Sequence, residues 1–600
     1  MDALKEEWPL GGVGRARWEK AAAAVLRRSR RMTDDQDPAE VADLLSTRTL
    51  EGVRVPALGT AADLPVPPVR VLPPVRVDGW DIRIPVTDPD RARAERSVLT
   101  NLERGGSSLW VTVGPGGTDP RDLAGLLAGV FLDFAPVVLQ APAGLTTQTA
   151  RAFLDVLDER ELIPAAGSNL GADPIGHLAR GWIPEAEVAP QIAEIAGLAR
   201  HPGLRAFVVD TTVLHNAGSG QVQELAYSLA AGVTYLRLLT ASGVPVQRAV
   251  RLIEFRYAAT DDQFLTIASL RAARRLWNRV TALSGVPTAD RTQLQHAVTS
   301  WAMTTRYDPF VNMLRTTVAA FAAGTGGADA VTVLPYDTAI GVSDDMANRV
   351  ARNTSSLLIS ESHVAKVADP AGGSYAVEEL TDSLARAAWA EFQLIESEGG
   401  ILASLAGGGL AGRVAATAAA RTAAISHRRM ALTGVSEFPL AGEVLLTRPP
   451  LPAGTGGPFA PHRYAETFEG LRDIPAAAPV FLAPIGSAAA HTARATFAAN
   501  LLAAGGIEVV RPQVPAGADE LVAAFRKAGT TVAAVVGTDA DYAEHAPELI
   551  TALRAAGATW ILLAGKPRGA LADLVDDHVV VGADAITFLT TTRAHLTGTV

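Results

Sequence analysis

Residues Val480–Val510 read VFLAPIGSAAAHTARATFAANLLAAGGIEVV, and this stretch decides the fold class. A short apolar run, Val480–Ala483, is followed by a helical pattern over His491–Ala503 and by a second apolar run, Ile507–Val510. Apolar runs that alternate with helices predict parallel strands joined by helical crossovers. The alternation continues over Ala518–Lys527, Val532–Val536, Tyr542–Ala555, Trp560–Leu563, Gly569–Asp573, Val579–Val581 and Ala583–Leu596.

The five strand–helix units between residues 479 and 600 predict a flavodoxin-like, doubly wound sheet. Such sheets bind ligands in a crevice outside the carboxyl ends of their strands. The glycines that end or follow the predicted strands should therefore line the crevice. They are Gly486, Gly537, Gly565 and Gly582.

The chain before this domain shows the same alternation on a larger scale. Strands are predicted at Ser108–Val113, Pro136–Gln140, Ala206–Asp210 and Ala330–Leu334, and helices at Val222–Ala231, Asp262–Leu283, Asp308–Ala323 and Leu380–Glu396. This length of strand–helix alternation favours a TIM (β/α)8 barrel over an open sheet. The predicted class is therefore α/β, a barrel followed by a flavodoxin-like domain.

Composition and irregular segments divide the 600 residues into four parts. We expect an N-terminal arm for subunit contact at 1–65, a barrel domain at 66–400, a linker region at 401–478 and the flavodoxin-like domain at 479–600. The linker prediction rests on the Pro- and Gly-rich stretch from Arg448 to Ala478, which we expect to be irregular. A chain of this size exceeds what one core usually holds.

Charge, cysteine content and hydropathy exclude several classes of protein. The formal net charge of -10 argues against a nucleic-acid binder with a basic surface. The absence of Cys excludes disulfides and thiolate-ligated metals. We expect no membrane span and no secretory signal, and therefore a cytoplasmic protein.

Two histidines are candidate functional residues on their position alone. His215 follows the strand Ala206–Asp210, and the carboxyl ends of barrel strands carry the chemistry in this fold. It could act as a general acid or polarise a carbonyl. The alternative is a structural His that caps a loop, since no titratable partner is close in sequence. His491 starts a helix after the first strand of the last domain, either as a metal-ligating imidazole or as a residue without a ligand.

Six segments resemble those of the coenzyme B12-dependent acyl-CoA mutases, and they occur in the order of that family. They are Gly79–Arg83 (GWDIR), Glu224–Gly232 (ELAYSLAAG), Tyr307–Thr316 (YDPFVNMLRT), Ala351–Thr354 (ARNT), Asp369–Glu379 (DPAGGSYAVEE) and Leu380–Trp389 (LTDSLARAAW). The resemblance extends from about Gly79 to Val600. It implies a substrate-binding TIM barrel joined by a long linker to a cobalamin-binding flavodoxin-like domain.

The chain departs from the catalytic members of this family at the cofactor. In those members an Asp-x-His-x-x-Gly motif supplies the cobalt ligand and the carboxylate that orients it. His491 matches the ligand, but Ala489 stands at the Asp position and Arg494 at the Gly position. An Arg there would crowd the nucleotide tail of cobalamin. Where the family has Ser- and Gly-rich contacts, this chain has VVGTDAD at Val535–Asp541.

The barrel departs as well. The segment Ile84–Asp88 lacks the Tyr that packs at the reacting centre of the catalytic members, and His215 falls near their active-site His. Three segments resemble the small (beta) subunits of heterodimeric methylmalonyl-CoA mutases, which are catalytically silent copies of the large subunit. They are Val209–Gly218, Thr316–Gly341 and His491–Val510.

This resemblance implies a chain without catalytic, cofactor-binding or metal-binding residues, in which His215 and His491 are vestigial. It implies the large (alpha) subunit as partner, which would bind adenosylcobalamin and interconvert (R)-methylmalonyl-CoA and succinyl-CoA. Two alternatives remain open. One is a self-sufficient adenosylcobalamin-dependent mutase with His491 on cobalt. The other is a cofactor-free scaffold for a B12 enzyme system.

Overall fold

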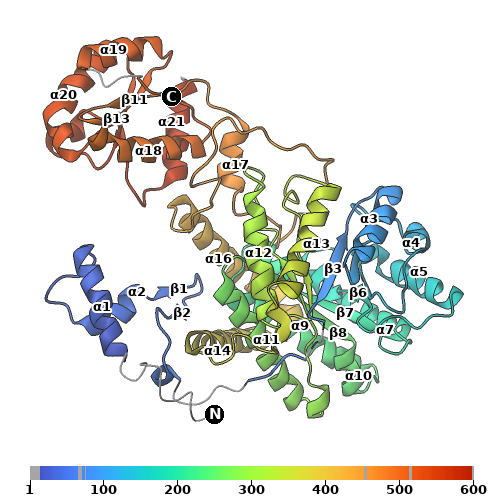
Figure 1. The fold of residues 1–600 in the computed structure, drawn as a ribbon. Coiled ribbons are helices and arrows are strands. Elements are labelled where there is room, and N and C mark those ends of the chain that lie inside the picture. Colours follow the sequence, from blue (N-terminus) through green and yellow to red (C-terminus); the bar gives the residue numbers. More distant parts are fainter. Residues whose placement is uncertain are drawn as a thin grey trace.

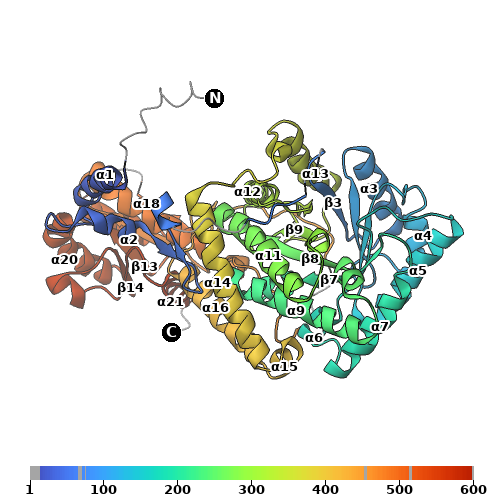
Figure 2. The ribbon, with the colours of Figure 1, turned by 90° about the horizontal axis from the view of Figure 1, so that it is seen from below.

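The computed structural model describes residues 14–64, 70–74, 76, 78–451, 456–512 and 517–597. Figure 1 shows a helix-covered barrel, a separate sheet domain at the C-terminal end in orange and red, and an arm in blue near the N-terminus. Figure 2 shows the same parts from below, with α14 and α16 along the side of the barrel that faces the arm. Within the described ranges, no helix combines the length and hydropathy that a bilayer span requires.

The barrel is closed by eight parallel strands in the order β10-β3-β4-β5-β6-β7-β8-β9. Its strands are β3 (Asp81–Val86), β4 (Ser108–Thr112), β5 (Val137–Gln140), β6 (Asn169–Ala172), β7 (Arg205–Asp210), β8 (Ile253–Ala259), β9 (Gln295–Thr299) and β10 (Ala330–Thr332). The last strand closes the ring by pairing Ala330 with Asp81. The predicted TIM barrel is therefore confirmed.

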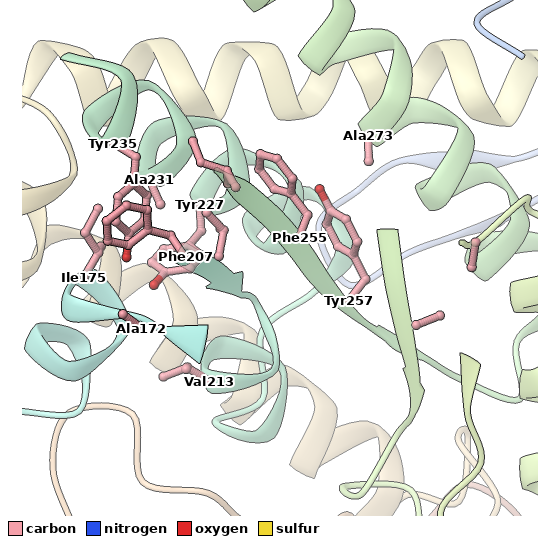
Figure 3. Close-up of a cluster of buried hydrophobic side chains, with 14 of the residues drawn as sticks. Ala172, Ile175, Phe207, Val213, Tyr227, Ala231, Tyr235, Phe255, Tyr257 and Ala273 are labelled. Atoms are coloured by element: carbon pink, nitrogen blue, oxygen red, sulfur yellow. The ribbon is translucent and has the colours of Figure 1, made fainter. Parts of the chain in front are cut away.

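Helices cover the outside of the barrel. They are α3 (Arg91–Glu103), α4 (Leu123–Leu126), α5 (Thr146–Glu159), α6 (Pro174–Ala179), α7 (Val188–Leu198), α8 (Thr212–Asn216), α9 (Gln221–Ala241), α10 (Val246–Arg251), α11 (Gln263–Leu283), α12 (Val311–Thr325), α13 (Asp345–Ser360) and α14 (Tyr375–Ser397). Helix α9 is buried on nearly all sides. Figure 3 shows its Tyr227 and Tyr235 beside Phe207 of β7, and the ring centroids of Phe207 and Tyr235 are 5.0 Å apart.

Charged side chains cross the barrel interior, where aliphatic layers usually stack. Arg83 of β3 forms an ion pair with Glu254 of β8, and Asn169 of β6 donates to the same carboxylate at 3.2 Å. These strands are not neighbours in the ring, so the contacts run through its interior. His296 of β9 binds Thr332 Oγ1 at 2.8 Å. The axis of this barrel is therefore filled by interlocked polar side chains.

The motif Asp369–Glu379 has a structural role. Arg271, on the buried face of α11, contacts Asp369 Oδ2 and Glu378 Oε1, each at 2.9 Å. The backbone N–H of Gly373 also donates to Glu378 Oε1, at 3.1 Å. These ion pairs fix the turn that starts α14 to α11.

The region after the barrel is more helical than the sequence suggested. Helices α15 (Ile401–Ala406) and α16 (Gly409–Ser426) follow α14, and α17 (Glu466–Asp473) lies inside the stretch expected to be irregular. That expectation was wrong for α17 because Phe468 anchors the helix in the core beneath the C-terminal sheet, and Glu469 binds Arg463 Nη2 at 2.7 Å. Residues 452–455 of the stretch lie outside the described residues.

The C-terminal domain is a five-stranded parallel sheet in the order β12-β11-β13-β14-β15, which is the flavodoxin-like order and confirms the predicted class. Its elements are β11 (Val480–Pro484), α18 (Ala488–Ala504), β12 (Val509–Val510), α19 (Ala518–Lys527), β13 (Val532–Val536), α20 (Asp539–Ala555), β14 (Trp560–Ala564), β15 (Asp577–Val579) and α21 (Ala585–Thr597). The last strand starts earlier than predicted, and Val581 is 86% exposed beyond its end.

The arm comprises α1 (Arg15–Arg28), α2 (Val41–Leu45), β1 (Thr47–Arg48) and β2 (Arg54–Val55). Its helices share a small apolar cluster of their own, formed by Ala23, Leu26, Met32 and Val41. Glu51, between the two strands, reaches the barrel and accepts the backbone N–H groups of Val222 at 2.9 Å and Gln223 at 2.8 Å. The arm is therefore attached to the first turn of α9.

Candidate functional site

His215 lies in the short helix α8, at the carboxyl end of β7, and both of its ring nitrogens contact protein groups. Nδ1 is 2.9 Å from Glu224 Oε1, and Nε2 is 2.6 Å from Ser300 Oγ. The His215 and Glu224 side chains are buried. No titratable partner was expected from residues close in sequence, and the fold supplies one. Glu224 follows nine residues later, and the first turn of α9 brings its carboxylate back to the imidazole.

Side chains from the region after the barrel cover His215. The Tyr464 hydroxyl lies 3.5 Å from His215 Nε2, and the His462 backbone N–H donates to the Asn216 carbonyl at 2.8 Å. Arg421 of α16 donates to the carbonyls of Gly218 and Ser219 and stacks over the Tyr464 ring at 5.0 Å. The imidazole is therefore enclosed, and its hydrogen-bonding capacity is used within the chain.

A cavity of about 660 Å³ opens at the carboxyl ends of β4 to β8, where TIM barrels carry their active sites. Its charged and titratable lining residues are Asp173, His177, Arg180, Asp210 and Arg256. The described residues that line it do not include His215. The structure thus separates the predicted histidine from this cavity.

The two arginines and two aspartates of the cavity form a linked set. Arg256 Nη1 contacts Asp210 Oδ2 at 3.3 Å and donates to Gln140 Oε1 at 2.8 Å, and its guanidinium lies 4.2 Å from the Trp110 ring. Arg180 Nη2 is 3.6 Å from the same Asp210 oxygen. Burial would raise the pKa of Asp210, but Arg256 and Arg180 more than offset it, so its pKa lies below the ordinary value.

Burial shifts the pKa values of two other groups of the cavity in the direction that favours their neutral forms. Burial raises the pKa of Asp173 to about 7, and Arg180 offsets only part of this effect. Burial, and then repulsion by Arg180, lowers the pKa of His177 to about 4. Asp173 Oδ2, His177 Nδ1 and Arg256 Nη2 are buried and have no hydrogen-bond partner in the described part of the chain. Such atoms are normally satisfied by water or a ligand, so the cavity suits a small polar molecule.

In the C-terminal domain, Arg494 occupies the crevice at the carboxyl ends of the strands. Its Nη1 donates to the Gly537 carbonyl, at the end of β13, at 2.8 Å, and its Nη2 contacts Asp539 Oδ1 at 2.5 Å. The guanidinium stacks over Tyr542 at 5.0 Å and would lie 3.2 Å from a Cβ on Gly565, after β14. Arg494 therefore spans the ends of two central strands.

The segment Val535–Asp541 also uses its polar groups internally. Thr538 and Asp541 form the capping box of α20, with Thr538 Oγ1 donating to Asp541 Oδ2 at 2.5 Å. A Cβ on Gly486 would lie 2.5 Å from the Asp541 carboxyl group, so the loop after β11 packs closely against this cap. Most polar side chains of this segment therefore bind other groups of the chain and do not face a ligand.

His491 lies in the first turn of α18, whose N-terminus is capped by Ser487. Its Nδ1 is buried and has no hydrogen-bond partner among the described residues. Ala489 supplies no side-chain acceptor to orient the ring. Within the described ranges, no group of three or more His, Asp or Glu side chains is arranged to hold a metal ion.

The sequence did not indicate Asp173, Arg180, Asp210 or Arg256 as site residues. Arg256 stands within the strand IEFRYAA, and only the closed ring shows that it points across the barrel to Gln140 of β5. Asp210 ends a predicted strand. Because the carboxyl ends of barrel strands carry site residues, this position could have indicated Asp210 as a candidate.

Comparison with known proteins connects these features to a family. Residues 170–447 match the family model for methylmalonyl-CoA mutase. The chain is 46% identical to the methylmalonyl-CoA mutase small subunit of Streptomyces virginiae, over 96% of this chain and 95% of that protein. It is 44% identical to a probable small subunit of Mycobacterium tuberculosis, over 93% of each chain. It is 36% identical to the small subunit of Propionibacterium freudenreichii subsp. shermanii, over 96% of this chain and 93% of that protein.

Proposed function

The chain belongs to the methylmalonyl-CoA mutase family, where it is similar to small subunits over nearly its whole length, and we propose that it is the non-catalytic subunit of a heterodimeric mutase. On this proposal the large subunit binds adenosylcobalamin and interconverts (R)-methylmalonyl-CoA and succinyl-CoA. This chain contributes buried interface and thereby stabilises its partner.

The environment of His215 carries the non-catalytic part of the proposal. A general acid must reach the substrate with one ring nitrogen. In this chain Glu224 and Ser300 bind both nitrogens, and Tyr464 covers the ring. The His215 imidazole therefore holds α8, α9 and the strand end of β9 together.

The C-terminal crevice supports the proposal that this chain does not hold cobalamin. The Arg494 guanidinium lies where a doubly wound sheet would receive its ligand, and its hydrogen bonds to Gly537 and Asp539 hold it there. A ligating His is normally oriented by a partner on its other ring nitrogen, and His491 Nδ1 has none in the described part of the chain. The residues of this crevice do not fit the cofactor.

We assign contact with the large subunit to the arm. The cluster formed by α1 and α2 is separate from the barrel core, and Val25 of α1 is 62% exposed. The ion pairs of Arg15 with Asp63 at 2.9 Å and of Arg54 with Asp43 at 3.2 Å lie within the arm, and Arg54 also reaches Glu379 of α14 at 3.4 Å. An arm of this kind gains most of its buried surface from a partner.

Co-expression with the large subunit tests the proposed function. The full-length chain should copurify with the large subunit as a 1:1 complex that is an active mutase, and the isolated chain should show no conversion of methylmalonyl-CoA. A truncated chain that starts at Thr47 keeps Glu51 and the barrel. The truncated chain should fold, which a cooperative thermal transition would show. It should copurify with much less large subunit than the full-length chain.

Mutase activity of the isolated chain that disappears in a His491→Ala variant would instead establish a self-sufficient enzyme. Failure of the full-length chain to associate with the large subunit would contradict the subunit role and favour a scaffold for another protein.

A further inference from the structure

The outer wall of the barrel contains a basic pocket of about 460 Å³ between α3 and α13. These helices follow β3 and β10, which are neighbours in the closed ring, and they lie side by side in both ribbon views (Figures 1 and 2). Five arginines line the pocket, at positions 93, 96, 104, 349 and 352. The pocket shares no lining residue with the cavity at the carboxyl ends of β4 to β8.

Most of this positive charge is not neutralised by the chain. Arg93 is paired with Asp88 at 2.8 Å and Asp90 at 3.5 Å. Arg96, Arg104, Arg349 and Arg352 have no carboxylate within ion-pair distance among the described residues, although Asp345 lies at the pocket. Arg104 and Arg349 repel the charge of Arg352, and an anion in the pocket would relieve this repulsion.

Arg352 supplies an independent indication of a ligand. Its side chain is buried, with 6% of the residue surface exposed. Nη1 donates to Asn101 Oδ1 at 2.8 Å and Nη2 to Asn353 Oδ1 at 3.2 Å, whereas Nε has no partner in the described part of the chain. Burial, and then repulsion by Arg104 and Arg349, lowers the pKa of Arg352. A buried guanidinium without a carboxylate partner carries a charge that the chain does not compensate, and an anion in the pocket would compensate it.

The lining favours a small oxyanion over a protein segment. Besides the arginines it consists mainly of hydroxyl and amide side chains, including Ser97, Thr100 and Asn348, with Met346 as its apolar member. The cores of protein interfaces are rich in aromatic and apolar side chains, which this pocket does not offer among its described lining residues. Guanidinium groups bind phosphate oxygens bidentately, and hydroxyl and amide groups complete such sites.

From this cluster we propose that the pocket between α3 and α13 binds the diphosphate group of a small phosphorylated molecule. Several unneutralised arginines match the charge of a diphosphate better than that of a single phosphate. The volume also exceeds the need of a lone phosphate. This inference uses only residues of the barrel wall and is independent of the proposed subunit role.

Isothermal titration of the purified full-length chain with pyrophosphate and with ADP tests this proposal. Succinate serves as a dianion without phosphate. Both diphosphates should bind, with an affinity that falls as salt is raised, and succinate should not. Equal affinities would show that the diphosphate alone is recognised, and tighter binding of ADP would show that the nucleoside also contributes.

Exposed arginines of the pocket provide the variants. Arg104→Gln and Arg349→Gln should each weaken binding about tenfold, and together about a hundredfold, without lowering the thermal midpoint. Arg121→Gln is the matched control, since Arg121 is exposed and pairs with Asp119 elsewhere on the barrel. It should bind like the unaltered chain.

Absence of binding by both diphosphates, or binding that the pocket variants leave unchanged, would overturn the proposal. The proposal would also be overturned if the unaltered chain bound no diphosphate and the pocket variants no longer associated with the large subunit. That result would identify the pocket as a protein contact.

Discussion

The contact between His215 and Glu224 accounts for a histidine at the position where a barrel enzyme would place a catalytic group. A buried carboxylate is tolerated when its oxygens accept hydrogen bonds, and Glu224 Oε1 accepts from Ser219 Oγ at 3.2 Å and contacts the imidazole at 2.9 Å. Removing the imidazole would leave this carboxylate buried with one partner fewer. His215 is therefore a stabilising residue in this account.

We predict that His215→Ala destabilises the barrel by about 2–4 kcal/mol, because the variant leaves Glu224 and Ser300 with unmet hydrogen bonds. Urea unfolding followed by tryptophan fluorescence measures the loss. His545→Ala, at an exposed position of α20, is the matched control and should change stability by less than about 0.5 kcal/mol. If the His215→Ala variant were as stable as the control, the imidazole would not contribute to the stability of the barrel.

Around His491, the residues that depart from the family motif are close together in the chain. The positions of Ala489 and Arg494 beside His491 were readable, and Arg494 indeed lies across the strand ends. The pairs Arg83–Glu254 and Arg256–Gln140 were not readable, because their members are on distant strands and only barrel closure brings them together.

Helix α9 is the element at which the arm meets the barrel. The Glu51 carboxylate takes the place of an N-cap there, since it accepts two of the first backbone N–H groups of the helix. A Cβ on Gly220 would lie 2.2 Å from Glu51 Oε2, so a side chain at this position would displace the Glu51 carboxylate. Burial raises the pKa of Glu51 to about 7, although these N–H groups oppose the shift.

This shift predicts a pH dependence of stability. Unfolded Glu51 titrates near its ordinary value of 4.5, so between about pH 4.5 and about pH 7 the folded chain binds a proton that the unfolded chain does not. Stability should therefore fall as pH rises through this window, by up to about 3 kcal/mol from this group. Urea midpoints measured across the window should fall less in Glu51→Gln than in the unaltered chain.

Asp173 has a raised pKa as well and contributes in the same direction, so the comparison between variant and unaltered chain is the informative quantity. Glu159→Gln, at the exposed end of α5, should follow the unaltered chain. Parallel curves for Glu51→Gln and the unaltered chain would show that Glu51 does not titrate in this window.

Elements with strong periodicity were predicted well. The strands at 108, 137, 206 and 330 and the helix Ala518–Lys527 agree with the structure within one or two residues at their starts. Helix α17 was missed because Pro and Gly dominate its surroundings, and its stability comes from Phe468 and Glu469 in tertiary contacts. Local signals cannot report such contacts.

The whole molecule combines the architecture of a cofactor enzyme with side chains of its own at the barrel axis and in the C-terminal crevice, while the cavity at the carboxyl ends of β4 to β8 stays open. The barrel axis holds Arg83 and Glu254, the imidazole at the strand end is enclosed, and the C-terminal crevice holds Arg494. The order of the parts was predictable because strand–helix alternation and the family resemblance agreed. The side chains that fill the barrel interior were not predictable, because they depend on which residues meet across the closed ring.

The central claim is that the chain is a family member without its own cobalamin. The most direct test is the amount of cobalamin, measured from visible absorbance, in the purified complex with the large subunit. We predict one cobalamin per 1:1 complex, with no change when His491 is replaced by Ala in this chain. Two cobalamins per complex, or loss of one in the His491→Ala variant, would contradict the account.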